Sequence, residues 1–210
     1  MSARSESSSR PAEAGGAGPA IALGLVLLTI SWGLLHVGFW HRNPIIDTPL
    51  YQDYGEKIGD GKVPYRDFPV EYPPAALPVF VLPALADDDD YGSAFELLMW
   101  ACAVATIVLL AVTLSAVSAG TVRLYAATAF AGIVPLLLGS VILTRFDLWP
   151  AALAAAALAA FVSGRDRLGL GVLGLATAAK LYPAVLLPIA LVWVARRRGP
   201  REAALGLGVF

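Results

Sequence analysis

Residues 20–40, AIALGLVLLTISWGLLHVGFW, decide the class of fold. This run is close to the ~20 apolar residues that a helix needs to cross a bilayer. It is longer than the apolar core of a signal peptide, and no small-residue cleavage site follows it. We therefore predict a permanent membrane anchor, with Trp32, Phe39 and Trp40 as candidate interfacial anchors near its outer end.

The whole chain has the composition of a polytopic membrane protein. Of its 210 residues, 58% are hydrophobic and only 15% are charged. Lipid admits only helices or closed barrels, and the long continuous apolar runs lack the alternation of a barrel strand. The sequence therefore predicts an all-α transmembrane bundle. The net charge of −1 gives no electrostatic reason to expect nucleic-acid binding, and the single cysteine, Cys102, excludes an internal disulfide or a Cys-based metal site.

Two regions are expected along the chain. Residues 1–19, rich in Ser, Ala and Gly, are predicted to be a disordered cytosolic tail, and residues 20–210 a transmembrane module. Further membrane segments are predicted at 95–119, 124–143, 148–162 and 168–195. The last of these is long for one crossing and carries Lys180, Tyr182 and Pro183 at its middle. A helical hairpin with a polar tip fits it, and a single long tilted span stays open as the alternative.

The positions of the arginines indicate how the chain is oriented in the membrane. The positive-inside rule groups Arg123, residues 164–167 and residues 196–201 with the cytosolic tail. This requires that residues 74–86, which two prolines interrupt, form an interfacial or re-entrant helix on the outer side. We therefore expect a multi-pass protein of the cell membrane with a cytosolic N-terminus. Because the final residues, AALGLGVF, resemble the start of another span, we expect an N-terminal fragment that is incomplete at its C-terminus.

A polar segment follows the first span. Residues 42–73, RNPIIDTPLYQDYGEKIGDGKVPYRDFPVEYP, are dense in carboxylates, tyrosines and prolines, and the predicted topology puts them outside the cytoplasm beside the turn at 144–147. Carboxylates next to a bilayer act as a general base, as metal ligands or as ion-pair partners, and spacing alone does not choose among these. The outer face would collect Asp47, Tyr51, Asp53, Tyr54, Arg66, Asp67, Glu71, Tyr72, Arg145 and Asp147.

Several of these residues carry a resemblance to a known family. The pattern comprises Asp47, Tyr51, Gly61, residues 63–68 and residues 71–74. It resembles the first extracytoplasmic loop of membrane glycosyltransferases of the GT-C type. The later segments RFDLWPA and ATAAKLYPAVLLP are similar to the same group. The greatest similarity is to the polyprenyl-phosphate-mannose-dependent mannosyltransferases, the glycosyltransferase 87 group with its DUF2029 relatives.

The resemblance implies a GT-C-like helical bundle and a reaction. A sugar, mannose in the family, leaves a polyprenyl phosphate donor and joins a hydroxyl of a glycolipid or polysaccharide acceptor outside the cytoplasm, with inversion. Asp47 matches the first-loop aspartate that is the base in the family. The leaving phosphate needs positive charge, for which Arg145, Arg66 and Lys180 are candidates. No cofactor and no metal site are predicted, and a requirement for a divalent metal ion stays open.

Aromatic and acidic side chains complete the predicted substrate-binding set. Tyrosine rings stack on sugar faces, and their hydroxyls donate hydrogen bonds. The expected partners are the lipid-linked sugar donor, the acceptor and membrane lipids. Besides the cations, the set contains Tyr51, Tyr65, Glu71, Tyr72 and Asp147.

Plainer structural roles remain open for these residues. Asp47, which precedes Thr-Pro, fits a helix cap. Arg145 and Asp147 fit an ion pair within their turn, and Lys180 fits a side chain that snorkels to the interface. Arg66, with its neighbouring acids, fits a solvated loop.

Two other function classes also remain open. A transporter would use charges and broken helices in a membrane hairpin, although a long acidic loop is unusual for it. An inactive paralogue or non-catalytic subunit of a cell-envelope assembly system is the other. Gly169, Gly171 and Gly174 spell G-x-G-x-x-G, but no strand precedes them, so we expect close helix packing instead of dinucleotide binding.

Overall fold

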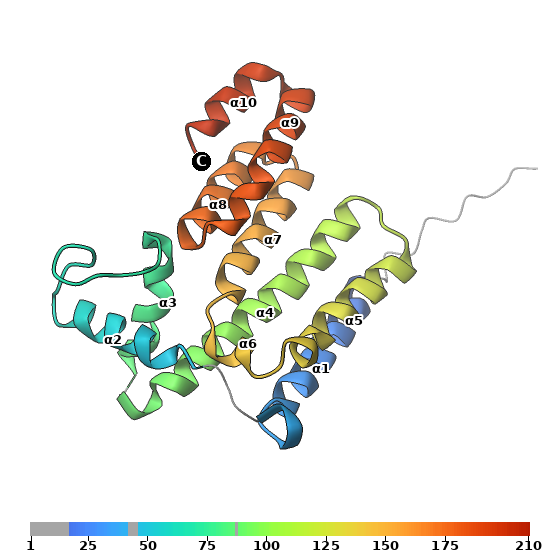
Figure 1. The fold of residues 1–210 in the computed structure, drawn as a ribbon. Coiled ribbons are helices and arrows are strands. Elements are labelled where there is room, and N and C mark those ends of the chain that lie inside the picture. The colour runs from blue at the N-terminus through green and yellow to red at the C-terminus, as the bar shows by residue number, and fades with distance from the viewer. Residues whose placement is uncertain (1–16, 42–45, 87) are drawn as a thin grey trace, which may run out of the picture.

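The computed structural model describes residues 17–41, 46–86 and 88–210 (Figure 1). The described part is helical, and its one β-bridge, between Pro64 and Phe68, is isolated. The α-helices are α1 (Ala17–Leu34), α2 (Thr48–Gly59), α3 (Leu77–Val81), α4 (Tyr91–Ala116), α5 (Thr121–Leu138), α6 (Val141–Thr144), α7 (Leu148–Val162), α8 (Asp166–Ala179), α9 (Leu187–Arg198) and α10 (Pro200–Leu207). Short 3₁₀ turns are η1 (Gly38–His41), η2 (Pro74–Ala76), η3 (Pro83–Leu85), η4 (Asp88–Asp90) and η5 (Tyr182–Leu186).

Within the described residues, α1, α4 and α5 are the three helices long and apolar enough to cross a membrane, and α7 is a shorter apolar helix. The all-α membrane fold is thus confirmed. The predicted tail is wrong at its end, because α1 already begins at Ala17. Residues 1–16 of that prediction lie outside the described part. The predicted span 124–143 is also too long: α5 ends at Leu138, because Pro135 lies in its last turn and Gly139 follows with φ +70°.

The segment predicted as a hairpin folds as one. Helix α8 ends before Lys180, and α9 returns so that the Arg198 Nε lies 3.0 Å from the Asp166 carboxylate at the start of α8. This contact excludes a single straight span across 168–195. Residues 74–85 form the consecutive elements η2, α3 and η3, an apolar helical stretch that is shorter than the three candidate spans. The terminal run that resembled a new span lies mostly in α10, whose Gly206 packs on Leu170 of α8.

Helices α1 and α5 approach each other closely through glycines. A Cβ atom at Gly132 would lie 2.5 Å from the Gly24 carbonyl oxygen, and one at Gly24 would lie 2.8 Å from the Thr128 carbonyl oxygen. Small residues at such crossings let two backbones pack without side chains between them. The predicted packing role of the later glycines is confirmed as well, since a Cβ at Gly169 would lie 2.7 Å from the Phe161 ring.

Gly132→Ala is expected to destabilise the α1–α5 pair. The added methyl group meets backbone, which cannot rotate away, so the cost should be about 1–3 kcal/mol, the usual range for overpacking. Thermal unfolding of the purified protein in detergent measures it. Gly33→Ala is the matched control, because nothing lies within 4 Å of a Cβ there. Equal midpoints for the two variants would contradict the close crossing.

Polar contacts of Trp32 and His36 with Glu96 join the end of α1 to the start of α4. The Trp32 indole donates to the Glu96 carboxylate at 2.7 Å, and the His36 Nε2 lies 2.8 Å from the same oxygen. The His36 Nδ1 lies 3.0 Å from the Trp32 carbonyl oxygen. A protonated imidazole donates to both acceptors, whereas a neutral one donates to only one. Partial burial lowers the pKa of His36, but the hydrogen bond and charge of Glu96, with the Trp32 carbonyl, raise it further, so the net pKa is above its ordinary value.

Stability should therefore depend on pH through His36. Because the folded pKa is raised, the stabilisation is fully present below about pH 6.5, the unfolded value, and is lost as pH rises through the folded value. The imidazole is half-exposed, so the effect should stay below about 1 kcal/mol. The measurement compares thermal midpoints of the wild type and His36→Gln at pH 5.5 and pH 8.5. The difference between the two thermal midpoints should be larger at pH 5.5 than at pH 8.5. A difference that does not change with pH would refute the stabilising role of protonated His36.

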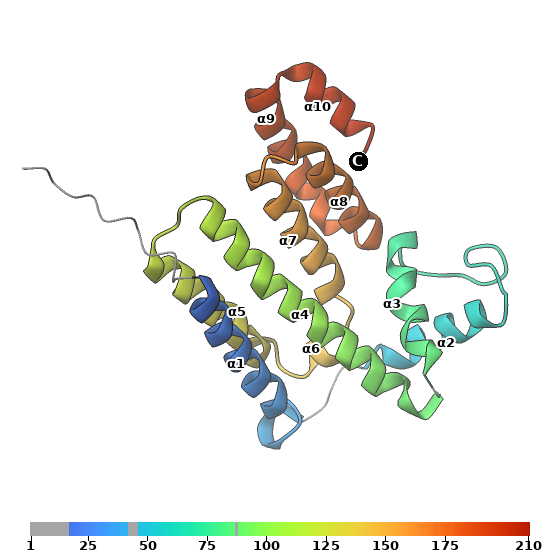
Figure 2. The same cartoon turned by 180° about the vertical axis from the view of Figure 1, so that it is seen from behind.

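The charged residues lie on elements at the two ends of the bundle, and Figures 1 and 2 show how these elements are arranged. One end holds α2, α3, α6, the start of α4 and the tip of the α8–α9 hairpin. Ten described carboxylates and five basic side chains lie there: Asp47, Asp53, Glu56, Asp60, Asp67, Glu71, Asp89, Asp90, Glu96 and Asp147, with Lys57, Lys62, Arg66, Arg145 and Lys180. The opposite end holds seven arginines and two carboxylates: Arg123, Arg165, Arg167, Arg196, Arg197, Arg198 and Arg201, with Asp166 and Glu202.

Candidate functional site

An aromatic cluster positions the candidate site at the acidic end. Tyr51 of α2 stacks on Phe80 of α3 with ring centroids 4.5 Å apart, and Phe146 meets Phe80 edge-on at 5.3 Å. Tyr72 meets Phe146 edge-on at 4.8 Å. Tyr51, Phe80 and Phe146 are fully buried, so the cluster fixes the polar loop against the helices. Aromatic pairs of this geometry contribute about 0.5–1.5 kcal/mol beyond the area that they bury.

Asp47 and Arg145 meet above this cluster. The Asp47 Oδ2 lies 3.1 Å from the Arg145 Nε and accepts a long hydrogen bond, 3.4 Å, from the Tyr51 hydroxyl. Burial raises the pKa of Tyr51, which keeps this hydroxyl protonated as a donor. Asp47 stands at the N-cap position of α2 but makes no side-chain capping hydrogen bond. The capping role that the sequence left open is therefore absent, and the carboxylate points instead to a cation from a distant segment.

Lys180 and Asp147 form the second pair of the site. The Lys180 Nζ contacts the Asp147 carboxylate and lies 5.0 Å from the centroid of the Phe146 ring. Arg145 and Asp147 flank Phe146 in sequence, and each pairs with a different segment. The expected ion pair within the turn is thus replaced by two pairs that join α2, the Arg145–Asp147 turn and the hairpin tip.

Arg145 and Lys180 both have hydrogen-bond donors that a ligand could use. The Arg145 side chain is 40% exposed, and its buried Nε makes no hydrogen bond of good geometry despite its short distance to Asp47. Its terminal nitrogens have no acceptor among the described residues. Lys180 is 31% exposed and can donate three hydrogen bonds. Each of the two side chains can therefore still donate hydrogen bonds to an entering anion.

The remaining predicted residues divide into two groups. Tyr51 contacts Asp47 through its hydroxyl, and Tyr72 meets the Tyr51 ring edge-on at 5.8 Å, but the Tyr51 ring is only 1% exposed. The prediction that this ring stacks on a sugar is therefore wrong, because Phe80 already covers it. Tyr65, with φ +64°, donates its hydroxyl to the Tyr72 carbonyl oxygen at 2.7 Å and remains half-exposed.

Arg66 and Glu71 are exposed and make no contact with the Asp47–Arg145 pair. The Arg66 guanidinium makes two hydrogen bonds to Asp67, at 2.8 and 2.9 Å. These hydrogen bonds, with one from the Val63 amide, lower the pKa of Asp67. The solvated-loop interpretation therefore describes Arg66 as this structure holds it, and Asp53 likewise pairs with Lys57 at 2.6 Å on the exposed face of α2.

An apolar groove ends at the Asp147–Lys180 pair. Its volume is about 520 Å³, and it runs between α1, α4, α5, α6 and α7. Asp147 and Tyr182 are its polar lining residues at the end near the charges, and Phe130, Val134 and Leu138 of α5 line one wall. A groove of this kind suits a ligand with an apolar chain and a charged head.

The sequence analysis did not identify two side chains that support the site. Phe146 forms the floor between the two ion pairs, and the Trp149 indole donates to the Ala75 carbonyl oxygen at 2.9 Å, which ties α7 to η2. Both residues belong to the RFDLWPA segment, which is the sequence feature that could have identified them. Among the described residues, no three His, Cys, Asp or Glu side chains gather as a metal site.

These features define a helical membrane protein with a charged site at one end and an apolar groove leading into it. The sequence model of glycosyltransferase family 87 matches residues 70–210, and the chain belongs to this family of membrane glycosyltransferases. The matched range includes Glu71, Tyr72, Arg145, Asp147 and Lys180, whereas Asp47, Tyr51, Tyr65 and Arg66 precede it. A comparison with curated proteins finds no match, and a comparison with solved structures finds none either.

Proposed function

We propose that this glycosyltransferase moves a sugar, with mannose as the first candidate, from a polyprenyl phosphate to a hydroxyl of a glycolipid or polysaccharide. The observation that carries the proposal is the convergence of Asp47 and Arg145, from segments far apart in sequence, at a distance of 3.1 Å. The carboxylate and the guanidinium match the two needs of such a transfer. One takes a proton, and the other stabilises a leaving phosphate.

The proposed step is a single inverting displacement. Asp47 takes the proton of the acceptor hydroxyl as the new bond forms between that oxygen and the anomeric carbon. The bond from the anomeric carbon to the phosphate oxygen breaks on the opposite face, and its electrons leave with the polyprenyl phosphate. Arg145 and Lys180 then bear the charge of that phosphate. Tyr51 holds the Asp47 carboxylate in place through its hydroxyl.

The apolar groove supports a lipid-linked donor. It offers a polyprenyl chain about 520 Å³ of space between helices, and its polar end lies at Asp147, which contacts Lys180. A donor bound with its chain there would have its phosphate beside Lys180 and Arg145. A nucleotide sugar, which has no apolar chain, would leave the groove without a function.

The charge distribution supports the orientation. The arginine-rich end matches the cytosolic side under the positive-inside rule, so α1 would begin in the cytosol and the site would face outward. In this arrangement residues 42–73 act as the extracytoplasmic catalytic loop of a multi-pass protein. Residues 42–45 of that loop lie outside the described part.

The test is sugar transfer in membranes that contain the full gene product. Polyprenyl-phosphate [¹⁴C]mannose should label membrane glycolipids or polysaccharide, whereas GDP-[¹⁴C]mannose should not when polyprenyl-phosphate-mannose synthesis is absent. Parallel reactions with glucose- and arabinose-linked donors identify the sugar, and reactions with EDTA or Mg²⁺ test the metal requirement. Direct transfer from the nucleotide sugar would overturn the lipid-linked donor, and no transfer from any donor would favour an inactive paralogue.

A further inference from the structure

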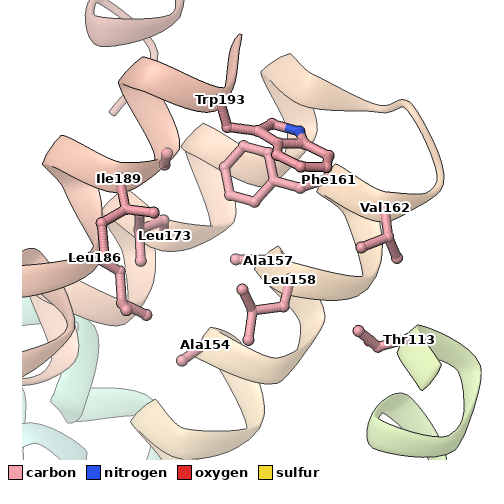
Figure 3. A pocket seen from close by; sticks show the side chains of 11 residues that line it. Thr113, Ala154, Ala157, Leu158, Phe161, Val162, Leu173, Leu186, Ile189 and Trp193 are labelled. Atoms are coloured by element: carbon pink, nitrogen blue, oxygen red, sulfur yellow. The ribbon is translucent and has the colours of Figure 1, made fainter. Parts of the chain in front are cut away.

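A second hollow lies along the α8–α9 hairpin, and it shares no lining residue with the groove that ends at Asp147. Its volume is about 180 Å³, and it lies between α7, α8 and α9, with Thr113 of α4 at one side (Figure 3). Its walls are apolar: Leu158 and Phe161 come from α7, and Ile189 and Trp193 come from α9. Leu158, Ile189 and Trp193 are 47%, 69% and 42% exposed, so the hollow opens sideways, toward the region that lipid occupies around a membrane protein.

Two arginines of α9 follow Trp193 at one end of this hollow. Arg197 donates to the Phe161 carbonyl oxygen at 3.2 Å, and its guanidinium lies 5.1 Å from the centroid of the Trp193 ring. Arg196 lies three residues after Trp193 and therefore on the same side of α9. It is exposed and has no partner among the described residues.

An apolar hollow with arginines at one end is suited to bind a phospholipid. An acyl chain matches the apolar hollow, and a phosphate matches guanidinium groups, which bind it with several hydrogen bonds. A protein partner is less suited, because the walls of the hollow face sideways and the charges lie only at its end. A neutral lipid would fill the hollow but leave the arginines without counter-charge.

We propose that this hollow binds one anionic phospholipid, with an acyl chain against Trp193 and Phe161 and its phosphate on Arg196 and Arg197. The site is separate from the groove that ends at Asp147, and it does not depend on the proposed sugar transfer. The lipid fills space between α7 and α9 and thereby supports the base of the hairpin whose tip carries Lys180.

Quenching of Trp193 fluorescence by brominated lipids tests the proposal. The purified full chain is placed in phosphatidylcholine nanodiscs that contain increasing fractions of lipid with brominated acyl chains, either phosphatidylglycerol or phosphatidylcholine. The Trp193 signal is the difference between the wild type and Trp193→Phe. Half-maximal quenching should need at least about fivefold less brominated phosphatidylglycerol than brominated phosphatidylcholine, as two surface arginines predict.

Three variants separate a site from general surface charge. The double variant Arg196→Gln/Arg197→Gln should lose the preference, whereas Arg123→Gln, at the same end but on α5, should keep it. Ala154→Leu, which adds side-chain volume to the wall of the hollow, should reduce quenching by both lipids. If the double variant does not fold, Arg196→Gln alone carries the test, because it breaks no described contact. Equal quenching by the two lipids, or an equal effect of Arg123→Gln, would overturn the proposal.

Discussion

Asp47→Asn is expected to lower sugar transfer by at least ~100-fold, because general-base catalysis contributes about 10²–10⁴-fold to such reactions. The amide has the shape of the carboxylate but cannot accept the proton of the acceptor hydroxyl. The change also replaces a carboxylate that is only 24% exposed and lies 3.1 Å from Arg145. Initial rates with polyprenyl-phosphate-linked sugar, at matched protein levels, measure the effect.

Asp53→Asn is the matched control for this experiment. Asp53 lies on α2, the helix that Asp47 precedes, carries the same side chain and pairs with Lys57 at 2.6 Å, but it is 47% exposed and forms no ion pair with Arg145 within the described part of the chain. Its rate should stay within about twofold of the wild type, as expected for an exposed ion pair of small energetic weight. Comparable losses in both variants would assign the effect to the stability of α2 and would remove Asp47 as the base.

The membrane helices could largely be predicted from sequence, because long apolar runs have few alternative structures in lipid. The bounds predicted for α7 agree with the structure, and the break at Lys180 was predicted from a charge and a proline inside an apolar run. The end of α5 was missed because Gly139 and Ser140 stand between two apolar runs, where these residues are compatible with helix or turn. Only the backbone, with its positive φ, distinguishes the two.

The residues of the site could be predicted from the sequence, but the ion pairs that they form could not. The sequence marked Asp47, Arg145, Asp147 and Lys180, but it grouped Arg145 with Asp147 because they are neighbours in the chain. In the structure Phe146 points into the aromatic cluster between them, and each charge turns to a different segment. Tyr51 was misjudged for a related reason. An aromatic residue with a hydroxyl suits both a sugar site and a core, and its burial is decided by contacts with Phe80 that the local sequence does not reveal.

Arg145→Gln is expected to lower transfer by about 10²–10³-fold, the usual cost of removing one donor that stabilises developing charge. The reason is specific to the geometry. Arg145 pairs with Asp47, and its terminal nitrogens, which have no acceptor among the described residues, can bind a phosphate. Arg66→Gln is the control: Arg66 pairs with Asp67 in the same loop, is 71% exposed and should change the rate little.

Binding of polyprenyl phosphate without a sugar separates this role from simple support of Asp47. If Arg145 receives the phosphate, Arg145→Gln should weaken the binding of polyprenyl phosphate at least about tenfold, a loss of one charged hydrogen-bonding partner. Asp47→Asn should not weaken it and should strengthen it, because Asp47 competes with the phosphate for the same guanidinium. The two substitutions at one ion pair thus have opposite expected effects on binding and the same effect on rate. If both variants bind polyprenyl phosphate as the wild type does, Arg145 only holds Asp47 in place, and Lys180 alone bears the leaving phosphate.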